Sequence, residues 1–389
     1  MSCKLETNVK YPVSRMSFVE KSIRELAIQA EHHDGKLPST SKLCTMLSTS
    51  VSTVNRAIST LKKEGLITAR QGKGFFVNGN PKRPATGMIA ILAAQTIHFD
   101  HPVLGKSAAG IQRVLQHHHL QTVLLGMDAD GNGGSADRRG KNSLLAPETL
   151  VNPNFFDAVI ILGLAASAIP RPLQPAAIMR LAATIPVGII DGQYMGGDKN
   201  IVQCWNGFDS GMLRAIIHLV ELGHRDIAII LGARDNDTAR MQRRGAEMAA
   251  AVYPDKKLNL RIIHASCSEE AGSREFARIL DGGRHPTALI AGADDIARGA
   301  YRVLTANRLQ VPRDISLISF NQWANIETIP MPVTSVMVDF NDSATRCAEE
   351  IVRLLNGERA TADDIMVPVD FAIRASTAAP HRQPTSTQA

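Results

Sequence analysis

The chain has 389 residues, of which 44 % are hydrophobic and 21 % are charged, which indicates a globular protein with two or three domains. Aromatic residues make up only 4 %, so stacking surfaces for a single-stranded nucleic acid are scarce. The five cysteines form no CxxC pair, which argues against a disulfide framework and a zinc site, and we expect reduced thiols, no metal and no cofactor.

The sequence does not open with a basic segment followed by an apolar stretch, and it contains no run of about 18 apolar residues. We therefore expect a cytoplasmic protein without a membrane partner. The net charge of +6 is uneven, because residues 1–83 hold 14 basic and 6 acidic residues, whereas the remainder holds 29 and 31. Such a basic segment is typical of a module that binds DNA, although a solvated basic tail would have the same composition.

The predicted elements of this segment begin with an amphipathic helix from Met16 to about His33, whose apolar residues recur every three or four positions. Gly35 ends this helix. Ser39 is placed as the N-cap of a second, short helix that ends near Leu47, and residues 48–50 form a turn.

A third helix runs from about Ser50 to Glu64 and is stopped by Gly65. Two strands follow, Leu66–Arg70 and Gly74–Val77, with a basic turn at residues 71–73 between them. This order predicts an α+β winged helix-turn-helix, which we place at residues 15–79.

The third helix has the composition of a recognition helix, because small polar, amide and basic side chains crowd its exposed first turns. Asn55 can bond adenine bidentately, Arg56 can bond guanine or phosphate, and Lys73 at the hairpin tip can reach a phosphate or the minor groove. The same side chains would also suit the polar face of an ordinary surface helix. The candidate DNA-binding residues are Lys42, Ser50, Ser52, Thr53, Asn55, Arg56, Gln71, Gly72 and Lys73.

Three stretches in this order, LPSTSKL, STVNRAISTLKKEGLI and RQGKGFFV, resemble the winged helix-turn-helix of the GntR family over about residues 16–78. The resemblance implies double-stranded DNA as the partner. It also implies phosphate-binding arginines at two positions that here hold Ser41 and Val51. Lys42 and Arg56 would then take over part of this binding, and we expect a weaker affinity for DNA rather than a different fold.

Residues 80–87 form a short, basic linker that contains two prolines. Beyond it, apolar strands alternate with amphipathic helices such as Gly207–Leu222 and Ser268–Leu280, which predicts an α/β fold with parallel sheets. Ligands of such sheets bind beyond the carboxyl ends of the strands. The predicted strands are Met88–Ala93, Thr122–Leu125, Ala158–Leu162, Val187–Ile190, Ile227–Leu231, Ala288–Ala291 and Ser316–Phe320.

Enzyme motifs are missing from the sequence, which has no GxGxxG, P-loop, HExxH or GxSxG pattern, and we therefore do not expect an enzyme. Residues 131–134, GNGG, lie in a polar loop without the lysine of a phosphate-binding loop. His117, His118 and His119 are consecutive on a predicted helix, so they point in different directions and make a poor metal site.

Several segments between residues 88 and 375 resemble the effector-binding domain of the LacI/GalR family, itself similar to periplasmic sugar-binding proteins. They are HPVLGKSAAGI, FDAVIIL, IPVGIIDG, HLVELGHRDIAIILG, HPTALIAGADDIARGAYRVLTANRLQVPRDISLISFNQ and MPVTSVMVDF. The resemblance implies a two-lobed, periplasmic-binding-protein-like domain at residues 88–378 with three crossovers, a sugar-like ligand between the lobes, and a homodimer. A GntR-type reader joined to such a sensor is similar to the arabinose repressors of Gram-positive bacteria.

Carried over position by position, the resemblance keeps an acidic residue, Asp191, after the IPVV-type strand. At the other ligand positions the family's asparagine is replaced by His101, its arginine by Gln242 with Arg240 nearby, its aspartates by Trp205 and Asn321, and a second asparagine by Asp294. Carboxylates, amides and an aromatic ring can bind a sugar through hydrogen bonds and stacking. Each of these residues can equally be an ordinary polar group of a loop.

The sequence favours a ligand-responsive repressor, a homodimer that places two recognition helices in successive major grooves and releases its operator when a sugar-like effector binds. Two alternatives stay open. One is a solute-binding or carbohydrate-processing protein in which the N-terminal module only dimerises. The other is a ligand-independent regulator whose cleft has degenerated at His101, Gln242 and Asn321.

Overall fold

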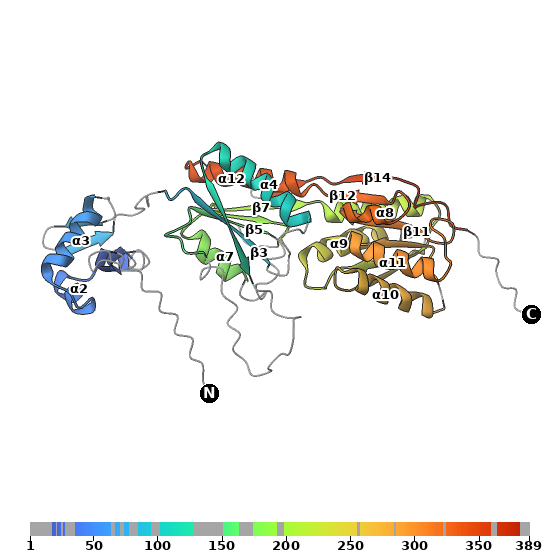
Figure 1. Ribbon diagram of the computed structural model, residues 1–389, viewed down its shortest axis with the longest axis horizontal. Coiled ribbons are helices and arrows are strands. Elements are labelled where there is room, and N and C mark those ends of the chain that lie inside the picture. Colours follow the sequence, from blue (N-terminus) through green and yellow to red (C-terminus); the bar gives the residue numbers. More distant parts are fainter. Residues whose placement is uncertain are drawn as a thin grey trace, which may run out of the picture. The chain divides into compact units, whose positions relative to one another are not determined.

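Figure 1 shows the computed structural model of the chain, in which residues 1–85 and 86–389 form two compact units. The structure describes residues 18–20, 22–24, 26–27, 36–63, 67–70, 74–77, 85–94, 102–127, 151–162, 174–192, 198–254, 257–283, 285–321, 324–358 and 364–381. Each unit has hydrophobic clusters of its own.

The first unit is the winged helix-turn-helix that the sequence predicts. Helical residues between 18 and 27 precede α2 (Thr40–Met46) and α3 (Val51–Lys63), and β1 (Ile67–Arg70) pairs antiparallel with β2 (Gly74–Val77). The Ser39 hydroxyl accepts a hydrogen bond from the Lys42 amide and so caps α2. One buried cluster joins the helices to β1, and its members include Val19, Ile23, Leu43, Val54, Leu61 and Ile67. The predicted turn at residues 71–73 lies outside the described residues.

The first lobe of the second unit is a parallel six-stranded sheet with the order β13-β7-β6-β5-β3-β4. Its strands are β3 (Met88–Ala94), β4 (Gln121–Met127), β5 (Ala158–Leu162), β6 (Val187–Ile190), β7 (Ile201–Asn206) and β13 (Asp364–Val367). Helices α4 (Pro102–His117) and α12 (Phe340–Leu355) cover one face, and α7 (Gln174–Ala182) covers the other. Because strand side chains alternate, Ile91 packs toward α4 and α12, whereas Leu92 packs toward α7.

The second lobe is a six-stranded sheet with the order β14-β12-β11-β10-β8-β9, in which only β14 pairs antiparallel. Its strands are β8 (Asp226–Leu231), β9 (Asn259–His264), β10 (Ala288–Ala291), β11 (Ser316–Asn321), β12 (Thr334–Met337) and β14 (Asp370–Ala372). Helices α8 (Phe208–Glu221) and α9 (Asp237–Val252) pack on one face. Helices α10 (Glu269–Asp281) and α11 (Asp294–Ala306) pack on the other, where the short 3-10 helix η2 (Ala324–Thr328) contacts α11.

The described chain passes between the two sheets after β7, after β12 and after β13. Strand β7 leads into α8 at Gly207, and β12 leads into α12 at Val338 and Asp339. Only Pro368 and Val369 separate β13 from β14. Two mainly parallel sheets joined in this way form the two-lobed α/β architecture that the sequence predicts.

Three pairs of helices in this unit pack closely at glycine. A Cβ atom added to Gly110 of α4 would lie 2.6 Å from a backbone oxygen of α12. A Cβ on Gly245 of α9 would lie 2.1 Å from a backbone oxygen of α8, and one on Gly299 of α11 would lie 2.1 Å from a backbone oxygen of α10. These distances are shorter than any normal contact, so the helices can approach this closely only where the side chain is missing.

Gly110→Ala and Gly105→Ala are a matched pair of substitutions in α4. Gly110→Ala should lower the free energy of unfolding by about 1–3 kcal/mol, because the added methyl group forces α4 away from α12. Gly105 has open space around its added Cβ, so Gly105→Ala should raise stability by about 0.5–1 kcal/mol through helix propensity. Urea denaturation of the full chain measures both changes, and effects of the same sign would contradict the packing argument.

Candidate functional site

The first candidate site is the outer face of α3 in the winged helix-turn-helix. Among the predicted DNA contacts, Lys42, Ser50, Ser52, Asn55 and Arg56 are exposed and Thr53 is half-buried. The Ser50 hydroxyl accepts a hydrogen bond from the Thr53 amide and lies 2.9 Å from the hydroxyls of both Ser52 and Thr53. Three hydroxyl groups thus gather where the backbone amides of α3 point outward, and such a helix start can bind a phosphate group.

Two further side chains of this unit, Val51 and Arg70, bear on DNA binding. Val51 stands where the resemblance implies an arginine, and its side chain is 56 % exposed. Arg70 at the end of β1 lies over the ring of Phe76 in β2, with its guanidinium carbon 4.4 Å from the ring centroid. Arg70 directly precedes the predicted basic turn, which is the signal that could have identified it. Gln71, Gly72 and Lys73 themselves lie outside the described residues.

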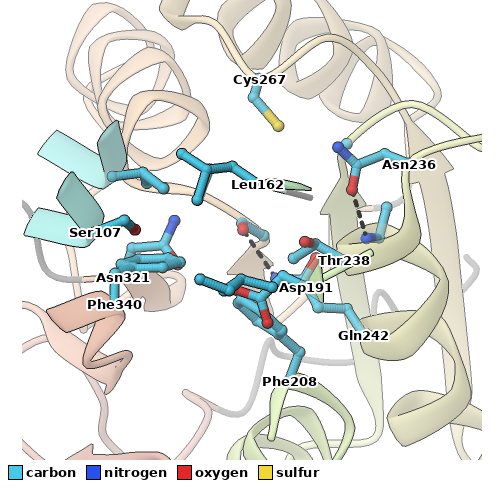
Figure 2. A pocket seen from close by; sticks show the side chains of 16 residues that line it. Ser107, Leu162, Asp191, Phe208, Asn236, Thr238, Gln242, Cys267, Asn321 and Phe340 are labelled. Atoms are coloured by element: carbon cyan, nitrogen blue, oxygen red, sulfur yellow. Dashed lines mark hydrogen bonds between the residues drawn. The ribbon is translucent and has the colours of Figure 1, made fainter. Parts of the chain in front are cut away.

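The second candidate site is a cavity of about 120 Å³ between the two lobes of the second unit (Figure 2). The carboxyl ends of β5, β6, β8, β10 and β11 meet here, as the rule for parallel α/β sheets predicts. Residues of both lobes line it: Val103, Ser107, Leu162, Ile190, Asp191, Phe208, Gly232, Asn236, Thr238, Ala239, Gln242, Cys267, Gly292, Ala293, Asn321 and Phe340.

Three of the residues predicted for effector binding line the cavity, namely Asp191, Gln242 and Asn321. Trp205 does not line it. Trp205 and Asn206 are neighbours in β7, so their side chains point to opposite faces of the strand, and it is Asn206 that points to Asp191.

Two other predicted residues also lie away from the cavity wall. Arg240 is exposed and forms an ion pair of 3.1 Å with Asp237. Asp294 is fully buried, and its carboxylate accepts a hydrogen bond from the Ser319 hydroxyl in β11. His101 lies outside the described residues.

The carboxylate of Asp191 connects the cavity to two crossovers. One of its oxygens accepts a hydrogen bond from the backbone amide of Asn206 (2.8 Å), and the other accepts one from the Asn206 side chain (2.7 Å). The same side-chain amide donates to the hydroxyl of Ser343 (3.1 Å) in α12. Asn206 directly precedes the first crossover, and Ser343 follows the second. A ligand that contacts Asp191 therefore touches a side chain whose hydrogen bonds lead to both crossovers.

Asp191 combines burial with an unusual backbone conformation. Burial raises the pKa of its carboxyl group to about 6, and the two hydrogen bonds from Asn206 oppose this rise without cancelling it. The φ angle of Asp191 is +55°, in the left-handed region that side chains other than glycine rarely adopt. A perturbed titratable group and a strained backbone at one cavity-lining residue are typical of functional sites.

Asn321 lies at the corresponding place in the second lobe, at the end of β11. Its φ angle is +88°, only 8 % of it is exposed, and its side-chain oxygen has no hydrogen-bond partner among the described residues. Gln242 is also buried, but its amide donates to the backbone oxygen of Gly292 (2.9 Å). A buried amide oxygen without a partner is unfavourable. This oxygen is enclosed by protein, whereas other atoms of Asn321 line the cavity and can contact a ligand.

Aromatic rings form part of the cavity wall that sequence reasoning missed. Phe208 and Phe340 are the first residues of α8 and α12, directly after two crossovers, and their ring centroids are 6.4 Å apart. The signal that could have found them is the same in both cases, a phenylalanine at the start of the helix that follows an inter-lobe crossing. The polar lining residues missed were Ser107, Asn236, Thr238 and Cys267.

Within the described part of the chain, no group of three or more His, Cys, Asp or Glu side chains is placed to hold a metal ion. None of the helices in the described part of the chain is long and apolar enough to cross a membrane.

Comparison with protein families gives two matches. Residues 15–77 match the family model of the bacterial regulatory proteins of the gntR family, and residues 216–377 match that of the periplasmic binding protein-like domain. The chain therefore joins a GntR-type helix-turn-helix domain to a periplasmic-binding-protein-like domain of the LacI type, and both resemblances drawn from the sequence are confirmed.

Individual relatives are similar to this chain over different shares of its length. The lactose operon repressor of Escherichia coli (strain K12) is 26 % identical over 181 residues, which are 46 % of this chain and 49 % of the repressor, so the match spans about half of that relative. The HTH-type transcriptional regulator AglR of Rhizobium meliloti (strain 1021) is 25 % identical over 365 residues, 88 % of this chain and 95 % of the regulator. The crystal structure of the lac repressor dimer bound to operator and the anti-inducer ONPF aligns with a TM-score of 0.60 and 20 % identity, covering 78 % of this chain and 100 % of that chain.

Asp191→Asn should change the pH dependence of stability. The folded chain holds the pKa of Asp191 near 6, above its ordinary value of 3.8, so folding favours the protonated carboxyl group. Its contribution to stability therefore falls as the pH rises from about 4 to about 6, by about 3 kcal/mol in total. Urea unfolding of both proteins across this range measures the effect, because the other carboxyl groups cancel in the difference. A difference between the two proteins that does not vary with pH would contradict the assignment.

Proposed function

We propose that the chain is a sequence-specific DNA-binding transcriptional regulator, a repressor whose affinity for its operator changes when a small, sugar-like effector binds between the two lobes. The observation that carries the proposal is the presence in one chain of a basic winged helix-turn-helix and a two-lobed domain with a ligand-sized cavity. Residues 15–79 are assigned to DNA binding, residues 80–87 to the linker, and residues 88–378 to effector binding and dimerisation. The protein then acts on DNA in the cytoplasm and is not an enzyme.

The DNA contacts are assigned to the outer face of α3 and to the wing. Asn55 and Arg56 are exposed on the first turns of α3, where they can bond base edges in the major groove. The hydroxyl groups at the start of α3 and the exposed Lys42 suit phosphate oxygens, which set the register of the protein on the duplex. The wing contacts, Gln71, Gly72 and Lys73, are assigned from the sequence alone.

Direct effector contacts are assigned to Asp191, Gln242 and Asn321, which line the cavity. Asp294 is given a supporting role, because its hydrogen bond with Ser319 holds β11 two residues before Asn321. His101 keeps its assignment from the sequence alone. The positions of Trp205 and Arg240 away from the cavity wall do not support direct contact by either residue.

The cavity supplies a route by which an effector can act on the arrangement of the lobes. Asp191 accepts hydrogen bonds from Asn206, and Asn206 also donates a hydrogen bond to Ser343. A ligand that contacts Asp191 is therefore close to two of the crossovers between the lobes. In a homodimer, a change in lobe orientation alters the distance between the two recognition helices, which must match the spacing of two half-sites. The dimeric, operator-bound state of the lac repressor supports this assembly. Induction, in which the effector releases DNA, is the expected direction.

Arg56→Ala tests the DNA-binding assignment. The full-length wild-type protein first selects its preferred duplexes from a random pool. The variant should bind these duplexes about 10-fold to 100-fold more weakly than the wild type does, because one guanine or phosphate contact is removed. Arg302→Ala is the control, since Arg302 is an exposed arginine of α11 in the other unit, and its removal should leave DNA affinity unchanged. A wild-type affinity that does not fall steeply with salt would overturn the proposal and favour the solute-binding alternative.

Effector and operator binding should be reciprocally coupled. A sugar that raises the melting temperature of the protein should weaken binding to the selected duplex by about 5-fold to 150-fold, which is the usual range of such coupling. Fluorescence anisotropy of a labelled duplex, with and without the sugar, measures the change. DNA binding that no stabilising sugar alters would favour the ligand-independent regulator.

A further inference from the structure

The cavity between the lobes has an uneven distribution of charge. Asp191 is the only ionisable carboxyl group among the described residues that line it, and no described lining residue is lysine, arginine or histidine. The remaining polar side chains of the wall are neutral: Ser107, Asn236, Thr238, Gln242, Cys267 and Asn321. The described wall therefore offers hydrogen bonds but no positive charge.

The basic residues next to the lining positions are directed elsewhere. Arg240 follows Thr238 and Ala239 at the start of α9, but it is exposed and paired with Asp237 at 3.1 Å. Lys106 precedes Ser107 in α4 and is exposed, whereas Ser107 is 1 % exposed. Arg243 follows Gln242 in α9, but it is exposed and paired with Glu247 at 2.8 Å. None of these three cations belongs to the described cavity wall.

This arrangement disfavours an anionic ligand for two physical reasons. A phosphate or carboxylate that enters the cavity loses its hydration, and no cation of the described wall compensates for this loss. It also meets the like charge of Asp191, whose ionised oxygens can only accept hydrogen bonds and already accept two from Asn206. A like-charge contact of about 5 Å at a protein dielectric of about 20 lowers affinity by more than 100-fold.

The size and the apolar side of the cavity restrict the ligand further. Its volume of about 120 Å³ is slightly smaller than the cavity of about 150 Å³ that holds one benzene molecule in another protein, so the cavity restricts the ligand to a compound with a single ring. Phe208 and Phe340 supply aromatic surface for an apolar ring face. The Asn321 side chain and the Asp191 carboxylate supply polar groups for hydroxyl groups at the ring edge (Figure 2).

We propose that the cavity selects an uncharged monosaccharide and rejects the phosphorylated and carboxylated forms of the same sugar. The inference rests on the proposed function only in so far as the cavity is the effector site. The hydrogen bonds of Asn321 and Asp191 would then recognise hydroxyl groups, and the absence of a cation from the described wall would supply the discrimination.

Calorimetric titration of the full-length protein tests this selection with matched probes. The panel consists of neutral aldohexoses, aldopentoses and ketohexoses, each beside its terminal phosphate and, for the aldoses, its uronic acid. At least one neutral sugar should bind, and its charged partners should bind at least 100-fold more weakly. A phosphate or uronate that binds as tightly as its neutral parent overturns the inference, and so does the absence of binding by every probe.

Thr238→Lys adds a positive charge to the wall and gives a second readout. Thr238 is half-buried at the start of α9, so a lysine there brings an ammonium group to the cavity. The ratio of phosphate to neutral-sugar affinity should rise at least 10-fold. Ala250→Lys adds the same charge to an exposed position of α9 and should leave the ratio unchanged. An equal rise in both variants overturns the inference.

Binding of the selected duplex, measured on the same preparations, separates the two proposals. DNA binding without sugar selection removes the inference and leaves the regulator intact. Sugar selection without DNA binding removes the regulatory function and leaves the inference intact.

Discussion

The hydrogen bonds of the Asp191 carboxylate hold together the part of the second unit where the cavity meets two crossovers. A buried carboxylate is costly unless hydrogen bonds replace its lost hydration, and here both bonds come from Asn206. Since Asn206 also bonds Ser343, the ends of β6 and β7 and the start of α12 are held by one connected set of bonds. The raised pKa of Asp191 shows that burial outweighs these bonds, so the group stays sensitive to what else enters the cavity.

The two lobes present polar groups to the cavity in the same way. Asp191 directly follows β6 in the first lobe, Asn321 is the last residue of β11 in the second, and both adopt left-handed backbone conformations. Asp and Asn tolerate this conformation better than most residues, because a short polar side chain can bond locally. A carboxylate from one lobe and an amide from the other therefore face the same space. A ligand that bonds both would favour one relative orientation of the lobes.

Much of the fold could be predicted, because many elements depend on neighbours in the chain. The cap at Ser39, the amphipathic α3 and the fully apolar strands follow from local patterns. In the first helix the spacing of apolar residues correctly predicts that Ile23 and Ala27 are buried. It also predicts an inward Phe18, but Phe18 is 53 % exposed and Val19 is buried, because packing and not composition sets where the buried face begins. Strands β7, β9 and β12–β14 were not predicted. Polar residues interrupt their apolar pattern, and pairing with strands far along the chain stabilises them.

By itself the sequence determined the two domain types, the basic recognition helix and three of the lining residues, Asp191, Gln242 and Asn321, because ordered motifs carry this information. The tertiary structure alone decided that Asn206 and not Trp205 points to the site, since the alternation of β7 depends on its neighbours in the sheet. It also brought together Phe208, the first residue of α8 on the second lobe, and Phe340, the first residue of α12 on the first lobe. Three-dimensional contacts between residues more than a hundred positions apart are set by the crossovers, and local sequence patterns carry no record of them.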